Sequence, residues 1–168
     1  MKRKMKSLLP CLFLIGTLLL STSSVGPDFH EGSYTAVFME RSELERSVFF
    51  EQKSRDLINP GKIYCKDNYI FINEKYKGIH VIDNSTPANP KQVGFIIAPG
   101  CIDIAVKGNT LYLDNAVDLV AFNLETREVT ERIRDVFPEP GSPENFYYYG
   151  NRPANTILVG WKKTTNRL

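Results

Sequence analysis

Short segments of this chain recur about 40 residues further on, and this repeat constrains the fold more than any other feature. The recurring pairs are Pro60-Gly61 with Pro99-Gly100, Lys66-Asp67-Asn68 with Lys107-Gly108-Asn109, and residues 79–83 with 119–123. The turn residues carry most of the weight, because any two strands share an apolar pattern. The repeat predicts two similar units, residues 61–97 and 102–133.

Each unit contains four short runs rich in Ile, Val, Tyr and Phe, separated by turn residues, as expected of four strands. The runs are residues 62–66, 69–73, 79–82 and 92–97 in the first unit, and 102–106, 110–114, 118–123 and 129–133 in the second. Four strands in about 40 residues are typical of a β-propeller blade. The predicted fold class is all-β: a partial or incomplete β-propeller with two four-stranded repeats and a short N-terminal helix. A β-sandwich is the alternative.

Two flanking segments complete the predicted organisation. Residues 25–60 form an N-terminal extension, in which Ser42-Glu43-Leu44-Glu45 matches a capping box and predicts a helix that begins at Ser42. Residues 47–51 predict a short strand in the same extension. Residues 134–168 form a segment rich in proline and tyrosine, with one strand pattern at residues 156–161.

The first 24 residues have the three parts of a secretory signal peptide. A basic start is followed by a thirteen-residue apolar run, residues 8–20, and then by small polar residues. Ser23 and Ser24 mark the expected cleavage region, and an uncleaved signal anchor is the alternative. Cys11 lies inside the apolar run and not after it, so lipid anchoring is not expected. The sequence therefore predicts export to the periplasm, cell envelope or extracellular space, with membrane contact through this segment alone.

The charge balance argues against nucleic-acid binding. Lys plus Arg number 21 and Asp plus Glu 19, which gives a formal charge of +2. Four of the basic residues lie in the first six positions, so the chain beyond the signal segment is close to neutral. A near-neutral chain without a basic stripe lacks the electrostatic footprint that nucleic acid requires.

Two cysteines remain beyond the signal segment, Cys65 and Cys101. Both lie beside apolar strand positions, which favours two buried thiols, and an exported protein can also oxidise such a pair to a disulfide. With His30 and His80 as the histidines and no Cys-x-x-Cys motif, the sequence supports no zinc site. We expect no cofactor.

Residues 42–124 resemble the LVIVD-repeat proteins, which are bacterial exported proteins. The resemblance rests on Ile79-His80-Val81-Ile82-Asp83, on Ser85, Pro87 and Pro90 after it, and on Lys107-Gly108-Asn109. It implies an exported module regarded as a β-propeller and often a lipoprotein, and it implies no reaction. Two features depart from the family: the lipid-bearing cysteine is missing, and residues 124–128 replace the proline-rich loop in the second repeat.

No catalytic set stands out. Asp103, Asp114 and Asp118 lie close in sequence, but strand spacing does not make them an acid–base pair, and Asp at strand ends ordinarily bonds backbone amides. His80 is expected to be an outward or hydrogen-bonded side chain and not a base. We therefore predict that the chain is not an enzyme.

Aromatic residues near the C-terminus are the candidate binding surface. Tyr147, Tyr148, Tyr149 and Trp161 could stack on a carbohydrate or peptide, or could cover an open sheet edge. The leading functional expectation is an exported non-enzymatic binding or scaffold module with a protein or glycan ligand. The alternatives are a secreted hydrolase with a dispersed site and a structural subunit that completes its sheet by self-association.

The length of the sequence bears on the last alternative, a subunit that completes its sheet by self-association. Of 168 residues, about 144 follow the signal segment, fewer than four blades of about 40 residues require. We therefore expect the flanking segments or a second copy of the chain, as a homo-oligomer, to cover the open edges.

Overall fold

The computed structural model describes residues 33–144 and 150–164, all within one unit of residues 32–168. These residues form three antiparallel sheets and one short helix, which confirms the prediction of an all-β chain. None of the helices in the described ranges is long and apolar enough to cross a membrane. The signal segment with Ser23 and Ser24, and the tyrosines 147, 148 and 149, lie outside the described residues.

Sheet 1 has five strands in the order β2-β6-β5-β4-β3. They are β2 (Phe49–Glu51), β3 (Pro60–Lys66), β4 (Tyr69–Glu74), β5 (Gly78–Asp83) and β6 (Lys91–Ile97). β3 to β6 form a meander over the first repeat, and β2 adds a strand at the β6 edge. Asp67 joins β3 to β4 with φ of 51°, a left-handed conformation that aspartate tolerates better than most residues.

Sheet 2 has four strands in the order β10-β9-β8-β7. They are β7 (Ile104–Lys107), β8 (Thr110–Asn115), β9 (Asp118–Asn123) and β10 (Glu128–Ile133). The turns repeat the chemistry of sheet 1 in detail. Asp83 and Asn123, at the ends of β5 and β9, each accept backbone N–H bonds from residues just after them through Oδ1, at 2.8 Å and 2.9 Å. These side-chain turns end the third strand of each repeat.

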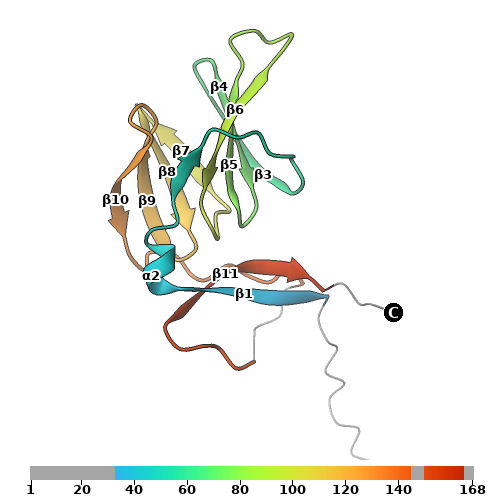
Figure 1. Ribbon diagram of the computed structural model, residues 1–168, viewed down its shortest axis with the longest axis vertical. Helices are drawn as coiled ribbons and strands as arrows, with labels where there is room; N and C mark the ends of the chain where they lie inside the picture. The colour runs from blue at the N-terminus through green and yellow to red at the C-terminus, as the bar shows by residue number, and fades with distance from the viewer. Residues whose placement is uncertain (1–32, 145–149, 165–168) are drawn as a thin grey trace, which may run out of the picture. The chain divides into compact units, whose positions relative to one another are not determined.

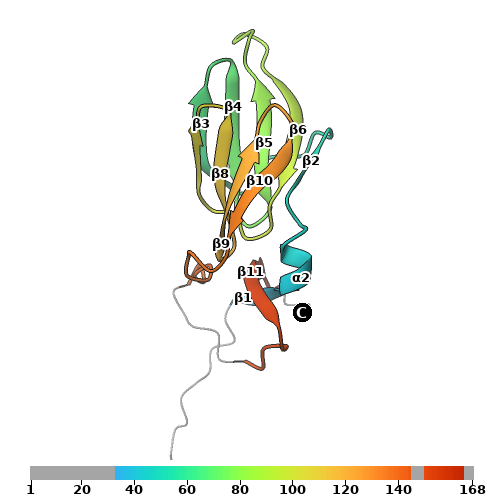
Figure 2. The same cartoon turned by 90° about the vertical axis from the view of Figure 1, so that its left-hand side faces the viewer.

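Sheet 3 pairs the two flanking segments. β1 (Tyr34–Glu40) runs antiparallel to β11 (Thr156–Lys163), and both views show the pair beside the ends of sheets 1 and 2 (Figures 1 and 2). The sequence predicted β11 and missed β1. The helix α2 (Arg41–Leu44) begins one residue earlier than predicted, and Glu40 at its N-cap makes no side-chain cap bond, so the capping-box prediction at Ser42 is wrong. A direct continuation from β1 leaves no loop in which Ser42 could cap the helix.

The core lies between sheets 1 and 2. Strand register places Phe71 opposite Val81 and Ile79 opposite Ile96, so these side chains share one face of sheet 1. They belong to the same buried cluster as the sheet 2 side chains Ile104, Val106, Leu111, Leu113, Val120 and Phe122. Leu44 of α2, Ala116 and Val159 of β11 form a second buried cluster that ties sheet 3 to the end of sheet 2.

A tight turn links the two repeats. Gly100 has φ of 83°, and a Cβ at this position would lie 2.6 Å from backbone and side-chain atoms of Ala116. Only glycine combines this backbone angle with so close an approach. The turn allows the chain to pass from β6 to β7 in a few residues, which brings the two sheets face to face.

Candidate functional site

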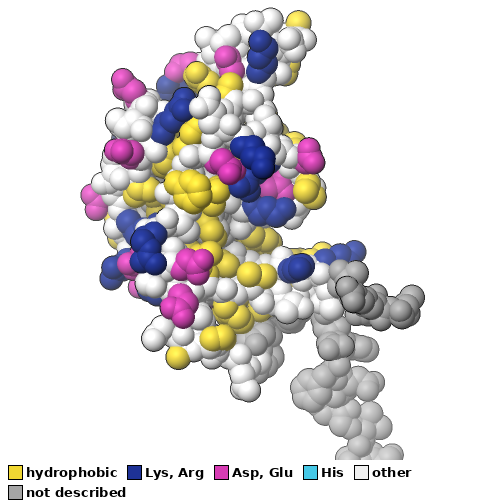
Figure 3. Space-filling model, in the orientation of Figure 1, with side chains coloured by type: hydrophobic (Ala, Val, Ile, Leu, Met, Phe, Trp, Pro, Cys, Tyr) yellow, Lys and Arg dark blue, Asp and Glu magenta, His cyan; other side chains and the backbone are white. Residues whose placement is uncertain are grey.

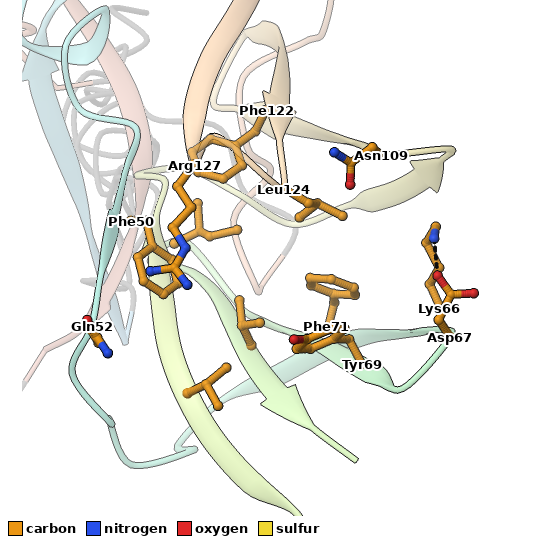
Figure 4. A pocket seen from close by; sticks show the side chains of 13 residues that line it. Phe50, Gln52, Lys66, Asp67, Tyr69, Phe71, Asn109, Phe122, Leu124 and Arg127 are labelled. Atoms are coloured by element: carbon orange, nitrogen blue, oxygen red, sulfur yellow. Dashed lines mark hydrogen bonds and ion pairs between the residues drawn. The ribbon is translucent and has the colours of Figure 1, made fainter. Parts of the chain in front are cut away.

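A cleft of about 400 Å³ opens between sheets 1 and 2 at the end where the β3–β4, β7–β8 and β9–β10 turns meet. Figure 4 shows Phe122 and Leu124 on one side of the cleft and Phe71 and Tyr69 on the other. The side chains that line it are Phe50, Gln52, Lys66, Asp67, Tyr69, Phe71, Val81, Val93, Ile96, Asn109, Phe122, Leu124 and Arg127. In the space-filling view, hydrophobic side chains reach the surface along the middle of the face, with charged side chains beside them (Figure 3).

The floor of the cleft is aromatic. Phe71 and Phe122 are 2% and 1% exposed, whereas Tyr69 at the mouth is 44% exposed. The rings of Tyr69 and Phe71 lie 6.4 Å apart between centroids. Alternation along β4 explains this arrangement, because residues two apart on a strand face the same side. Tyr69 and Phe71 therefore face sheet 2, and Ile70 and Ile72 face away from it.

The rim of the cleft is polar. Lys66 and Asp67 form an ion pair at the β3–β4 turn. The Arg127 guanidinium lies over the Phe50 ring, with Cζ 4.4 Å from the centroid, a geometry that favours a cation–π interaction. At the β7–β8 turn, Asn109 donates from Nδ2 to Glu125 at 3.2 Å. An apolar floor surrounded by a few hydrogen-bonding groups is the usual composition of a small-ligand site.

A second, smaller recess contains a buried chain of polar side chains. His80 and Glu74 are each 2% exposed, and His80 Nε2 lies 3.3 Å from Glu74 Oε2. The Gln92 amide donates to His80 Nδ1 at 2.5 Å, so Nε2 carries the proton that is donated to Glu74. Glu74 also accepts the backbone N–H bonds of Ile58 and Asn59 at 3.0 Å and 2.7 Å. These hydrogen-bonded side chains anchor the segment of the polypeptide that precedes β3.

The pKa of Glu74 reflects two opposing effects. Burial raises the pKa, whereas the backbone N–H groups of Ile58 and Asn59 and the bond from His80 lower it by more, so that it lies below its ordinary value. His80 is a hydrogen-bonded side chain, as expected from the sequence. These bonds hold the segment before β3 against sheet 1, which gives the cluster a structural role.

The three aspartates noted in the sequence bond different partners. Asp103 pairs with Lys62, and Asp118 bonds the guanidinium groups of Arg41 and Arg132 at 2.6 Å and 2.7 Å. Asp114 accepts the backbone N–H groups of Ile102 and Asp103 through Oδ1, and burial raises its pKa. Each carboxylate thus bonds its own partners. The described residues contain no cluster of His, Cys, Asp and Glu able to hold a metal ion.

Cys65 and Cys101 are free thiols, so they do not form the disulfide alternative. Cys101 is buried, as favoured, but Cys65 is exposed on β3 and corrects the expectation of two buried thiols. The reason is register: Cys65 pairs with Ile70, on the face of sheet 1 that points away from sheet 2. Burial raises the pKa of Cys101 well above its ordinary value.

Trp161 is buried, which removes it from the candidate binding surface. It is 9% exposed, and its indole Nε1 donates to the Pro140 carbonyl at 2.9 Å. The bond satisfies the indole N–H and fastens the proline-rich segment to β11. The sequence did not single out the cleft residues Phe50, Tyr69, Phe71, Phe122 and Arg127. Phe71 and Phe122 fill ordinary strand positions, and no sequence signal shows that the two sheets part at this end.

Comparison with known proteins leaves the family open. No protein-family model matches the chain, and no curated protein matches it. Among solved structures, the N-terminal domain of Nup159 is similar at 17% sequence identity and a TM-score of 0.37. The match covers 46% of this chain and 20% of that one, so the chain spans about a fifth of the structure it matches. A likeness this loose does not identify a family.

Proposed function

We propose that this chain is an exported, non-enzymatic binding module of the LVIVD-repeat type, built as a partial β-propeller. The two meanders packed face to face, with matching turns, support the propeller interpretation. The basic and apolar start of the sequence supports export. Fold alone does not assign function, so the proposal depends on a site.

The cleft between the sheets is the observation that carries the binding function. Its volume of about 400 Å³ suits a ligand of one or two rings. Tyr69 presents a half-exposed ring at the mouth, and Phe71 continues the aromatic surface inward. Flat aromatic faces pack well against the C–H face of a sugar ring, as well as against other rings.

The rim favours an uncharged ligand with hydroxyl groups. Lys66 and Asp67 neutralise each other, and together with Asn109 they offer both donors and acceptors at the mouth. The Arg127 charge is engaged with the Phe50 ring. A neutral saccharide satisfies this arrangement, because its hydroxyl groups both donate and accept while its C–H face covers the aromatic floor.

Titration of the full chain with a panel of neutral mono- and oligosaccharides, followed by NMR chemical shifts, tests the proposal. We expect shifts at residues around the cleft, and a loss of affinity of at least about tenfold on Tyr69→Ala. Phe49→Ala is the matched control, because Phe49 is 49% exposed on β2 and is absent from the cleft lining. Binding by no member of the panel, or equal affinity of the Tyr69 variant, would contradict the proposal.

A further inference from the structure

The contact between sheets 1 and 2 uses one face of each sheet. Sheet 1 contributes Phe71, Ile79 and Val81 to the shared buried cluster. The repeat places Tyr112, Leu119 and Ala121 at the corresponding positions of sheet 2. Register pairs Tyr112 with Ala121 on the face of sheet 2 that points away from sheet 1. The face that sheet 1 uses inside the chain therefore has its counterpart on the outer side of sheet 2.

The face that sheet 2 uses in this contact likewise has its counterpart on the outer side of sheet 1. Sheet 2 contributes Leu111, Leu113 and Phe122 to the buried cluster. Their counterparts one repeat earlier are Ile70, Ile72 and Ile82. Register pairs Ile70 with Ile82 on the outer side of sheet 1. Each sheet thus presents outward the counterpart of the face that the other sheet uses in the contact within the chain.

Each outer face carries an accessible group of apolar side chains among the described residues. We define the open face of sheet 1 as Ile63, Cys65, Ile70, Ile72 and Ile82, and the open face of sheet 2 as Ala105, Tyr112, Leu119, Ala121 and Ile133. Ile63 is 63% exposed, Ile133 is 53% exposed and Tyr112 is 36% exposed. Apolar side chains gathered on a sheet face indicate an interaction surface.

Segments of the chain already cover the adjoining part of each outer face. On sheet 1 the Arg55 guanidinium lies over the Phe95 ring, with Cζ 4.5 Å from the centroid. Beside sheet 2, Phe137 and Pro138 line a groove together with Tyr112 and Leu119. The uncovered part of each face includes the side chains that define the two open faces. On sheet 2 the exposed Glu131, beside Ala121, and Lys107, beside Ala105, border them.

A charge pattern accompanies the apolar one. Lys62 and Asp103 occupy corresponding positions of the two repeats, and their side chains pair across the contact between sheets 1 and 2. Both side chains remain more than half exposed, at 62% and 58%. A further sheet 1 stacked on sheet 2 would bring a second Lys62 beside Asp103, so opposite charges would alternate along the stack.

We propose that a second copy of this chain covers these faces, with the open face of sheet 2 in one copy packed on the open face of sheet 1 in the next. The contact continues the interface that already joins the two sheets of one chain. Such a contact is heterologous, because different patches meet, and it must close into a ring to leave no face exposed. Two copies provide four sheets, the smallest number usual for a closed propeller.

Light scattering on the full chain after size-exclusion chromatography measures the association. We expect the mass of two copies for the unchanged chain and of one copy for Ile63→Glu and for Tyr112→Glu. Thr86→Glu adds the same charge in the exposed β5–β6 loop and should keep the mass of two copies. Far-UV circular dichroism and melting temperature confirm that the variants remain folded. A single-copy mass for the unchanged chain at every concentration tested would overturn the proposal.

Mixing the two variants separates this arrangement from a symmetric contact of like faces. The Ile63→Glu copy retains an intact sheet 2 face, and the Tyr112→Glu copy retains an intact sheet 1 face. We expect an equimolar mixture to regain the mass of two copies through the one intact contact, more weakly than the unchanged chain. If only one variant dissociates, or if the mixture stays at the mass of one copy, the head-to-tail arrangement is wrong.

Discussion

His80 Nε2 lies 3.3 Å from Glu74 Oε2, and both side chains are almost completely buried on the side of sheet 1 that faces away from sheet 2. Glu74 ends β4 and His80 lies in β5, so the pair bridges two neighbouring strands. Through Glu74 the pair also holds the backbone N–H groups of Ile58 and Asn59. One carboxylate therefore fixes both the strand pair and the path by which the chain enters β3.

Glu74→Gln should destabilise the fold. The amide has one acceptor oxygen where the carboxylate has two, so a buried N–H group loses its partner at a cost of about 1–3 kcal/mol. Denaturant unfolding measures the loss, and hydrogen exchange should quicken at Ile58 and Asn59. Glu51→Gln is the control: its pair with Arg55 is partly exposed, and we expect a change of less than about 1 kcal/mol. Equal losses in the two variants would contradict this account.

Asp118 should make the stability of the fold depend on pH in the acidic range. Burial raises its pKa, but Arg41 and Arg132 outweigh burial and hold the pKa below its ordinary value. A lowered folded-state pKa contributes stability above the unfolded-state pKa, and this contribution is lost as pH falls through the folded-state value. Asp118→Asn should therefore cost about 2–4 kcal/mol at neutral pH, because it breaks a largely buried ion pair.

The difference in the free energy of unfolding between Asp118→Asn and the unchanged chain should become smaller as the pH falls into the acid range. Denaturant unfolding at neutral pH and at several acidic values measures it. Asp56→Asn serves as the comparison, since Asp56 is exposed and its side chain is not held by a buried arginine. If the difference in the free energy of unfolding between Asp118→Asn and the unchanged chain stays constant down to strongly acidic pH, the ion pair does not produce the pH dependence.

The two thiols should react at very different rates. Cys65 is exposed, whereas Cys101 is buried and burial raises its pKa well above the ordinary value, which suppresses the reactive thiolate. The measurement uses the Tyr112→Glu chain, which is expected to be a single copy with an uncovered Cys65. Brief treatment of this chain with iodoacetamide followed by peptide mass spectrometry should label Cys65 extensively and Cys101 only after unfolding. Comparable labelling of both in the folded chain would place Cys101 outside the core.

Gly100→Ala should be far more damaging than Gly108→Ala. Both glycines have positive φ, 83° and 58°, so each substitution costs about 1–2 kcal/mol in backbone strain. At Gly108 nothing lies within 4 Å of the added Cβ, whereas at Gly100 the added Cβ would lie 2.6 Å from Ala116. We expect at least about 2 kcal/mol more loss at Gly100, measured by thermal or denaturant unfolding. Similar losses would mean that the turn can shift away from Ala116.

Most strands were predictable because their signals are local. The runs over residues 62–133 contain alternating apolar residues bounded by turn residues, and the observed bounds of β3 to β10 differ from the predicted ones by at most two residues. β1 was missed because no turn residue separates its sequence, YTAVFME, from the helix that begins directly after it at Arg41. Its strand conformation depends on β11, more than 100 residues later in the chain.

The candidate site was not predictable in the same way. Tyr147, Tyr148 and Tyr149, predicted as part of a binding surface from their aromatic run, lie outside the described residues, and Trp161 is buried. The cleft instead joins Phe50, Tyr69 and Phe122, which come from three strands far apart in sequence. Proximity of this kind is a property of packed sheets and leaves no trace in the spacing of the residues.

The sequence by itself determined the all-β class, the two repeats and the turns that bound their strands, because turn chemistry and alternation act between residues near one another in the chain. Only the tertiary structure decided which face of each strand is buried. A strand presents two faces of similar composition, and the choice between them depends on what the sheet packs against. That choice buries Cys101, exposes Cys65, opens the cleft at Tyr69, and leaves Ile63 and Tyr112 on the faces proposed to join two copies.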